Sequence, residues 1–90
     1  MLTPKEKEKI VAEHKIHEKD TGSSEVQIGL LTEEIDRLLA HLKQHPKDLH
    51  SKRGLLRMVA KRRKLLSYLK EENVRRYNAL AKKIGIVKEK

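Results

Sequence analysis

The sequence has no cysteine, no phenylalanine and no tryptophan, and its only tyrosines are Tyr68 and Tyr77. Without cysteine there can be no disulfide, no thiolate metal site and no thiol nucleophile, which fits a reducing compartment. The sequence also lacks an apolar run long enough for a signal peptide or a membrane-spanning helix, so we expect a cytoplasmic protein that does not use a membrane. Since aromatic residues are scarce, the core must consist of Leu, Ile and Val.

Acidic residues are scarce in the second half of the chain. Residues 1–48 contain 8 Lys and Arg against 10 Asp and Glu, whereas residues 49–90 contain 14 against 3. The two net charges, −2 and +11, give the +9 of the whole chain. A basic half of this kind predicts a polyanionic partner, with nucleic acid favoured over an anionic membrane.

The first part of the chain predicts a weakly attached helix. Thr3 and Glu6 form a capping box, and Pro4 suits the first helical position. The apolar stripe that follows is thin and ends near residue 16. We therefore expect residues 1–17 to form a mobile N-terminal helix within a single domain that spans residues 1–90.

A second helix is expected over about residues 24–44, where Ser24 and Gln27 form another capping box. Its apolar residues recur at steps of three and four, as in one face of a helix. These residues are Ile28, Leu31, Ile35, Leu38 and Leu42.

Pro46 stops this helix, and Asp48 is the candidate N-cap of a third helix that runs to about Glu72. Asn73 then caps a short fourth helix that ends at Gly85. No segment alternates with period two, so no strand is expected. The expected fold is all-α, with four helices, of which helices two to four form a three-helix bundle over residues 24–86.

The third helix carries a basic face without acidic residues. Four cations and one aromatic residue recur at steps of 4, 4, 3 and 4, namely Arg53, Arg57, Lys61, Lys64 and Tyr68. A solvated helix face without a partner ordinarily mixes signs, whereas this sequence has no acid between Leu49 and Lys70. The cations suit phosphates and the tyrosine suits a sugar or a base, so the face predicts nucleic-acid binding.

The segment between the second and third helices contains three histidines, His41, His45 and His50, together with Asp48 and Ser51. These side chains include possible metal ligands and the residue types of a nucleophilic triad. However, Pro46 breaks the helix between the histidines, and a triad needs residues that converge from separate elements. A carboxylate among cations instead suits a donor on a base edge, such as the 2-amino group of guanine in the shallow minor groove of RNA.

A second polar corner precedes the second helix. Gly22 allows close approach of the backbone, while Thr21 and Gln27 offer side-chain hydrogen bonds. Taken alone, this segment is more typical of a turn with a helix cap than of a binding site.

Together these blocks resemble the bacterial-type family of small-subunit ribosomal protein fifteen, over about residues 20–86. The blocks that carry the resemblance are Asp20-Thr21-Gly22-Ser23, Glu25-Val26-Gln27-Ile28, Leu31-Thr32, His41-Leu42-Lys43, His45, Lys47-Asp48, residues 50–56, residues 62–66, Tyr68-Leu69, Arg76-Tyr77 and Leu80. They follow the order and spacing of the family.

The resemblance implies a structural protein that is not an enzyme, needs no cofactor or metal and is a monomer when free. It would bind the central domain of small-subunit ribosomal RNA, nucleate assembly of the platform for neighbouring proteins, and contact large-subunit RNA in an intersubunit bridge. Family contacts to a three-way RNA junction would fall on Thr21, Gly22, Gln27 and Tyr68. Contacts to a purine-rich minor groove would fall on His41, Asp48 and Ser51, with His45, His50, Arg53 and Lys64 in support.

The sequence departs from the family at several positions. Pro46 and Leu49 replace polar or basic residues, and Lys52 stands where arginine is usual. Glu71 and Glu72 occupy a stretch that is often basic, so no junction contact is expected from them.

Three other functions share parts of this pattern. A helix-turn-helix DNA-binding protein would also have a corner before a basic helix, but it would place Arg, Asn or Gln on the first turns of that helix. A metal-dependent enzyme would use the three histidines. A basic amphipathic protein on anionic membranes would need bulky aromatic residues that this sequence lacks.

Overall fold

The computed structural model describes residues 2–15 and 22–85. These residues form four helices, α1 (Pro4–His14), α2 (Ser24–Gln44), α3 (Leu49–Glu72) and α4 (Val74–Ile84), and no strand. The expected all-α fold is thereby confirmed. None of the described helices is both long and apolar enough to cross a membrane.

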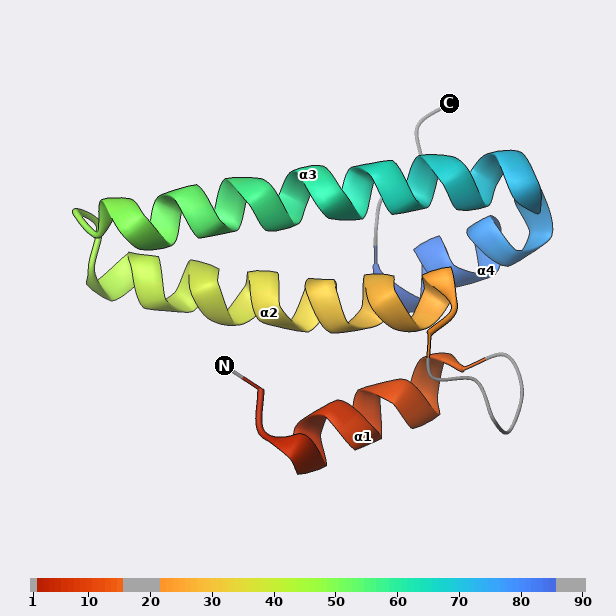
Figure 1. The fold of residues 1–90 in the computed structure, drawn as a ribbon, viewed down its shortest axis with the longest axis horizontal. Helices are drawn as coiled ribbons and strands as arrows, with labels where there is room; N and C mark the ends of the chain where they lie inside the picture. Colours follow the sequence, from red (N-terminus) through yellow and green to blue (C-terminus); the bar gives the residue numbers. More distant parts are fainter. Residues whose placement is uncertain (1, 16–21, 86–90) are drawn as a thin grey trace.

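The helices form a flat arrangement whose principal extents are 39, 35 and 17 Å. Helices α2 and α3 lie side by side in opposite directions, α1 lies along the other side of α2, and α4 folds back against the end of α3 (Figure 1). Helices α2, α3 and α4 are in mutual contact, as expected of the three-helix bundle.

The helix ends follow the capping signals of the sequence, with one correction. Thr3 and Asp48 cap α1 and α3 as expected, and α4 ends at Gly85, whose φ of 80° favours glycine. The N-cap of α2, however, is Ser23 and not Ser24. Ser23 has an extended backbone, so its hydroxyl accepts a hydrogen bond from the amide of Val26 at 3.2 Å.

The centre of the bundle is aliphatic. Ile28 of α2 and Leu69 of α3 are fully buried, and Leu80 of α4 is 3% exposed. The remaining core positions of α2 follow the expected stripe, and Leu31, Ile35 and Leu38 are all buried. Burial of these side chains supplies the main stabilising free energy, because no aromatic residue other than the two tyrosines is present.

A buried ion pair joins the first turns of α2 and α4. The guanidinium of Arg76 donates two hydrogen bonds to the carboxylate of Glu25, at 2.5 and 2.6 Å. Glu25 is the one described polar residue that is buried. A bidentate pair of this kind fixes the geometry of both helices, since loss of either partner would leave a buried charge uncompensated.

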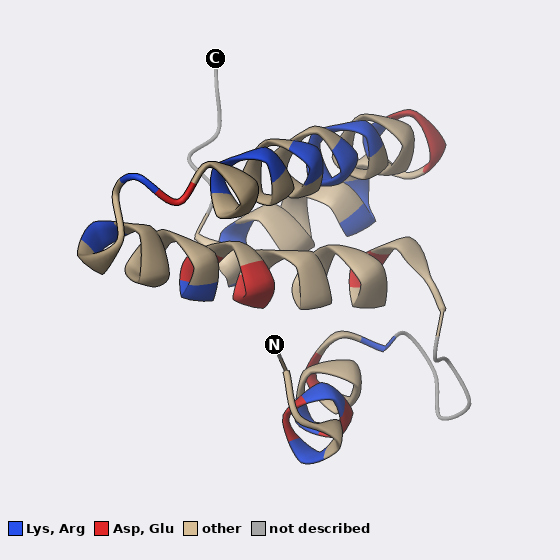
Figure 2. Ribbon diagram, turned by 60° about the vertical axis from the view of Figure 1, so that its left-hand side comes forward, with Lys and Arg blue, Asp and Glu red and all other residues tan. Residues whose placement is uncertain are grey.

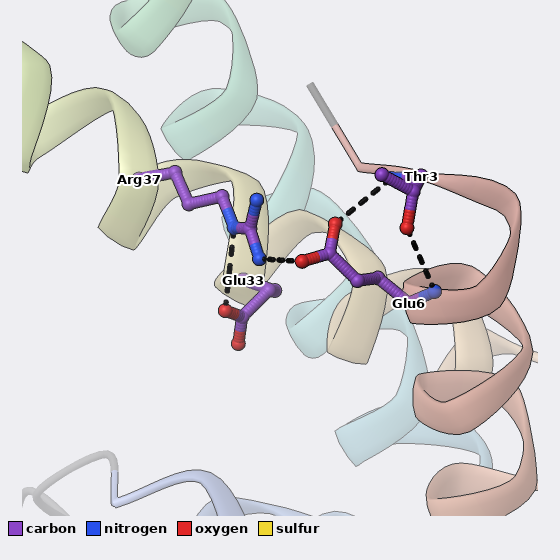
Figure 3. Close-up of polar contacts among 4 residues, drawn as sticks. All are labelled: Thr3, Glu6, Glu33 and Arg37. Atoms are coloured by element: carbon purple, nitrogen blue, oxygen red, sulfur yellow. Dashed lines mark hydrogen bonds and ion pairs between the residues drawn. The ribbon is translucent and has the colours of Figure 1, made fainter.

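Helix α1 contacts α2 through a few specific residues. Leu2 and Ile10 are buried, and Glu6 binds Arg37 of α2 while it also accepts a hydrogen bond from the amide of Thr3 (Figure 3). The hydrogen bond from the Thr3 amide, and then the one from Arg37, lower the pKa of the Glu6 carboxyl. The mobility expected of this helix remains a prediction.

At the end of α1, the imidazole of His14 packs directly against Gly29 of α2. A Cβ atom at Gly29 of α2 would lie 2.8 Å from Cγ and Nε2 of His14 and closer still to Cδ2. The ring therefore occupies the space that a side chain at position 29 would fill. Nδ1 of His14 is buried and has no hydrogen-bond partner among the described residues.

We expect the effect of Gly29→Ala to depend on His14. In the otherwise unchanged protein the new methyl group must displace the imidazole, so the free energy of unfolding should fall. In a His14→Ala background the same change should raise it by up to about 1 kcal/mol, because alanine favours a helix more than glycine does. Urea unfolding of the four proteins measures this coupling, and equal effects in both backgrounds would contradict the close contact.

The stability of the protein should also decrease as the pH is lowered, because His14 becomes protonated more readily in the unfolded chain. Burial, and then the nearby positive charge of Lys83, lower the pKa of this imidazole, while Glu13 and Glu25 oppose the shift. The unfolded chain therefore takes up the proton first, and stability present above about pH 6.5 is lost as the pH falls. We expect the unfolding free energy of His14→Ala to depend less on pH between about 7.5 and 5 than that of the unchanged protein, and identical profiles would contradict it.

Candidate nucleic-acid interface

The corner between α2 and α3 is short and closed by backbone hydrogen bonds. Helix α2 ends at Gln44, and His45 caps it through its amide, which donates to the carbonyl of His41 at 2.9 Å. The amide of Asp48 donates to the carbonyl of His45 at 3.1 Å, and α3 begins at the next residue. The end of one helix and the start of the next are therefore held close together.

This corner brings three predicted RNA-binding residues into one cluster, which we call the corner cluster: His41, Asp48 and Ser51. Oδ1 of Asp48 accepts a hydrogen bond from the amide of Ser51 at 3.0 Å, and Oδ2 accepts one from the hydroxyl of Ser51 at 2.7 Å. Nε2 of His41 lies 2.8 Å from the same Oδ2. All three side chains remain open to solvent in part.

The corner cluster keeps Asp48 ionised. The contact with His41, followed by the two hydrogen bonds from Ser51, holds the pKa of the Asp48 carboxyl far below its usual range. Because an ionised carboxylate can only accept, Nε2 of His41 must be the donor in their contact. Such a carboxylate has about four acceptor positions, and three are used within the cluster. One acceptor position on the carboxylate therefore remains for a hydrogen-bond donor of a binding partner.

The other two histidines of the segment have different positions. The ring of His45 lies against that of His41, with 4.7 Å between ring centres, and lines an open depression of about 420 Å³ with Pro46 and Lys47. His50 is exposed on the first turn of α3. Within the described ranges, no three side chains of the types that bind metals gather closely enough to hold an ion. The geometry therefore gives no support to the alternative of a histidine metal site.

The basic face of α3 is exposed along its whole length, and we call it the inner row: Arg53, Arg57, Lys61, Lys64 and Tyr68. Figure 2 shows basic residues along α3, with acidic residues only at its C-terminal end and at the N-cap that precedes it. Arg62, in contrast, is partly buried and donates a hydrogen bond to the hydroxyl of Thr32 at 3.2 Å. The helix thus separates one structural arginine from the cations that can reach phosphates.

Tyr68 is 56% exposed, but its hydroxyl has a partner within the protein. It donates a hydrogen bond to the carboxylate of Glu72 at 3.2 Å. The spacing of four residues on one helix explains the contact. An RNA group that binds this hydroxyl must therefore share it with Glu72 or displace the carboxylate.

The polar corner before α2 lies near the inner row. Nε2 of Gln27 donates a hydrogen bond to the carbonyl of Gly22 at 2.9 Å, which closes the turn. Gln27 also lines a groove of about 230 Å³ with Lys61 of α3 and Lys7 of α1. Thr21, predicted to act beside them, lies outside the described residues. Sequence patterns gave no signal for Lys7, because its place at this groove depends on how α1 packs.

These features define a class of protein before any comparison is made: a small helical protein with a basic face and an acidic group poised at one end of it. A cation row can neutralise phosphates, and the corner cluster can accept a hydrogen bond from a base edge. No catalytic arrangement arises from the corner cluster, since Ser51 donates to the carboxylate and not to a histidine.

Comparison with known proteins agrees with this class. The family model described as ribosomal protein S15 matches residues 7–87. The small ribosomal subunit protein uS15 of Carboxydothermus hydrogenoformans is 54% identical over 87 residues, which cover 97% of this chain and 98% of that protein. The proteins of the same name from Oceanobacillus iheyensis and Clostridium botulinum strain Hall are 56% and 57% identical, over 94% and 91% of this chain and 96% and 94% of their own.

The chain therefore belongs to the ribosomal protein S15 family. The bacterial-type membership expected from the sequence is confirmed, and with it a structural, non-enzymatic protein of the cytoplasmic ribosome. The enzymatic alternative is thereby wrong. The roles of individual residues remain predictions, because family membership does not test them.

We expect the cap function of Asp48 to be separable from its charge. Asparagine is as good an N-cap as aspartate, whereas alanine offers no acceptor to the first turn of α3. Asp48→Ala should lower the melting temperature by about 4–8 °C, and Asp48→Asn should retain most of it. Thermal unfolding followed by circular dichroism measures both, and an equal loss in the two variants would show that the charge itself is required.

Proposed function

We propose that this chain binds small-subunit ribosomal RNA through two adjoining surfaces, one at the corner cluster and one along the inner row. The corner cluster binds a purine-rich minor groove, and the inner row, with Gly22, Gln27 and Tyr68, binds a three-way junction. Thr21 belongs to the second surface by resemblance to the family. The basic surfaces and the family membership support this proposal.

The observation that carries the proposal is the single acceptor position left on Asp48. His41 and Ser51 occupy three of about four positions on the carboxylate and fix its orientation. An oriented, ionised acceptor recognises a donor in the minor groove, and the 2-amino group of guanine is the base donor found there. Adenine and uracil offer no such donor in that groove, so the contact distinguishes base pairs.

The inner row supplies affinity without sequence preference. Arg53 and Lys64 are exposed on the same flank of α3 and can each neutralise one phosphate. His45 and His50 lie beside the corner cluster and can donate hydrogen bonds to backbone or sugar oxygens. This division agrees with the general rule that phosphate contacts position a protein and base contacts give it specificity.

Glu71 and Glu72 modify the junction contact. Glu72 accepts the hydrogen bond of the Tyr68 hydroxyl and places a negative charge at the end of the inner row. RNA must approach this charge to reach Tyr68, so the pair weakens the contact relative to a chain with basic residues there.

The role in the ribosome follows from the same binding. The chain joins the central domain of the small-subunit RNA early, helps neighbouring proteins of the platform to bind, and contacts large-subunit RNA in an intersubunit bridge. It acts as a monomer before assembly. Resemblance to the family supports these roles.

The test of the minor-groove contact uses Asp48→Asn, because this variant keeps the helix cap. Binding to the cognate RNA, which carries the junction and the purine-rich groove, should weaken about ten- to a hundredfold, since one discriminating base contact is lost. Binding to the junction with a scrambled groove should change little. Electrophoretic mobility shifts measure both affinities.

Arg53→Gln is the matched control for this test. It should weaken binding to both RNAs alike and lower the dependence of affinity on salt by about one counterion. If Asp48→Asn weakens binding to both RNAs equally, Asp48 has no part in reading the groove. If duplex DNA of equal length binds as tightly as the junction, the RNA-junction proposal fails.

A further inference from the structure

Helix α1 is attached to the bundle without sharing its core. It lies on the side of α2 that is turned away from α3 (Figure 1). Of the described residues that precede α2, two are buried, Leu2 and Ile10. The core cluster of Ile28, Leu69 and Leu80 is formed by α2, α3 and α4 alone. Helix α1 can therefore leave α2 as a local unit while that cluster stays closed.

The end of α1 is held by two groups whose interaction depends on charge. The ring of His14 packs against Gly29 of α2. The ammonium group of Lys83 in α4 donates a hydrogen bond to the carbonyl of Glu13, one of the last carbonyls of α1. A cation suits this end of a helix. A second positive charge on the neighbouring imidazole would be repelled by Lys83, so the contact favours a neutral ring.

A protonated His14 would also lack a hydrogen-bond acceptor here. Both ring nitrogens then carry a hydrogen, and the buried Nδ1 has no partner among the described residues. The charges that act on the ring are Lys83 of α4, Glu13 of α1 and Glu25 of α2. Glu25 already accepts two hydrogen bonds from Arg76, so it cannot turn to His14 without loosening the buried ion pair.

The position of α1 also affects the proposed junction surface. Lys7 is exposed on α1 and lines the groove of about 230 Å³ with Gln27 and Lys61, which both belong to that surface. Lys9, two residues further along, instead lines a separate groove with Arg37. A docked α1 therefore adds one cation to the junction surface, and this cation departs when the helix does.

We propose that His14 is a pH-sensitive switch: its neutral ring keeps α1 docked on α2, and its protonation releases the helix and removes Lys7 from the junction surface. The effect on RNA rests on the proposed function, whereas the release of α1 does not. Because docking and junction binding favour each other, RNA in turn stabilises the docked helix.

The direction of the switch follows from the two states of His14. A released histidine has a pKa of about 6.5, and burial followed by the charge of Lys83 lowers the pKa of the docked ring. Docking is therefore fully favoured above about pH 6.5 and is lost as the pH falls toward the lowered pKa. Over that range the docking equilibrium falls by up to about tenfold per pH unit.

The first measurement follows the contact in the free, full-length chain by nuclear magnetic resonance. When α1 is docked, the Cδ2 proton of His14 lies against the α protons of Gly29, so a nuclear Overhauser effect connects them. We expect this signal to disappear between about pH 7.5 and 5, while the methyl shifts of Ile28, Leu69 and Leu80 stay unchanged. In His14→Phe, a ring that cannot be protonated should keep its contact at both pH values.

The second measurement compares the unchanged protein with His14→Phe in binding to the three-way-junction RNA, at about pH 7.5 and 5.5. The ratio of the two affinities cancels the protonation of the RNA and of the other histidines. The affinities should agree at the higher pH, and the unchanged protein should bind about three- to tenfold more weakly at the lower one, as expected for one lost phosphate contact. Gly29→Ala, whose methyl group displaces the ring, should bind weakly at both.

Lys7→Gln identifies the cation that α1 contributes. At about pH 7.5 it should lower the salt dependence of junction affinity by about one counterion. Lys9→Gln removes the same charge from the same helix and should change this dependence little. In a Gly29→Ala background, Lys7→Gln should have no effect, because α1 is already released.

The results that overturn the proposal differ from those that overturn the proposed function. A contact between His14 and Gly29 that persists in the unchanged protein at about pH 5 rules out the switch, and so does its loss in His14→Phe at the same pH. If the contact is lost but both proteins bind the junction equally at low pH, the coupling to RNA is wrong. If neither protein binds the junction at any pH, the proposed function fails, and the resonance titration still decides whether His14 releases α1.

Discussion

The burial of Ile28, Leu69 and Leu80 is the interaction on which the rest of the structure depends, because it joins α2, α3 and α4 in one place. The core is small and aliphatic, so each helix gives only one side to it. Most of the circumference of α3 therefore stays open to solvent, and that surface is where the cations lie. A larger core would have buried part of this basic surface.

The corner cluster shows how a negative charge can serve a basic surface. Asp48 caps α3, binds His41 and accepts from Ser51, and each of these contacts favours the ionised carboxylate. The favourable position at a helix N-terminus adds to the same effect. A single group thus closes the corner, starts the helix and presents an acceptor to a partner.

Much of the fold could be predicted from the sequence because its signals are local. The capping box of Thr3 and Glu6, the Asp48 cap and the Gly85 end each depend on residues within four positions, and all are observed. The predicted position of the α2 N-cap was wrong by one residue, since adjacent serines offer the same hydroxyl oxygen to the first turn. The grouping of His41, Asp48 and Ser51 was also accessible, because a short corner leaves little freedom.

The contacts that could not be predicted join residues far apart in the sequence. The pairing of Glu25 with Arg76, of Glu6 with Arg37 and of His14 with Gly29 depends on how the helices pack, and periodicity only shows which faces are apolar. The same limit applies to the candidate site. The place of Lys7 in the groove with Gln27 and Lys61 depends on how α1 packs on the bundle, so it required the structure.

The closed turn at residues 45–48 has a consequence for the order of events in folding. Joining α2 to α3 through so short a connection costs little chain entropy, and helical proteins with contacts between neighbouring segments fold in microseconds to milliseconds. Synthesis adds only about 5–20 residues per second. The hairpin of α2 and α3 can therefore form as soon as both helices have left the ribosome that makes them. Its corner cluster is then complete before all of α4 is available to pack.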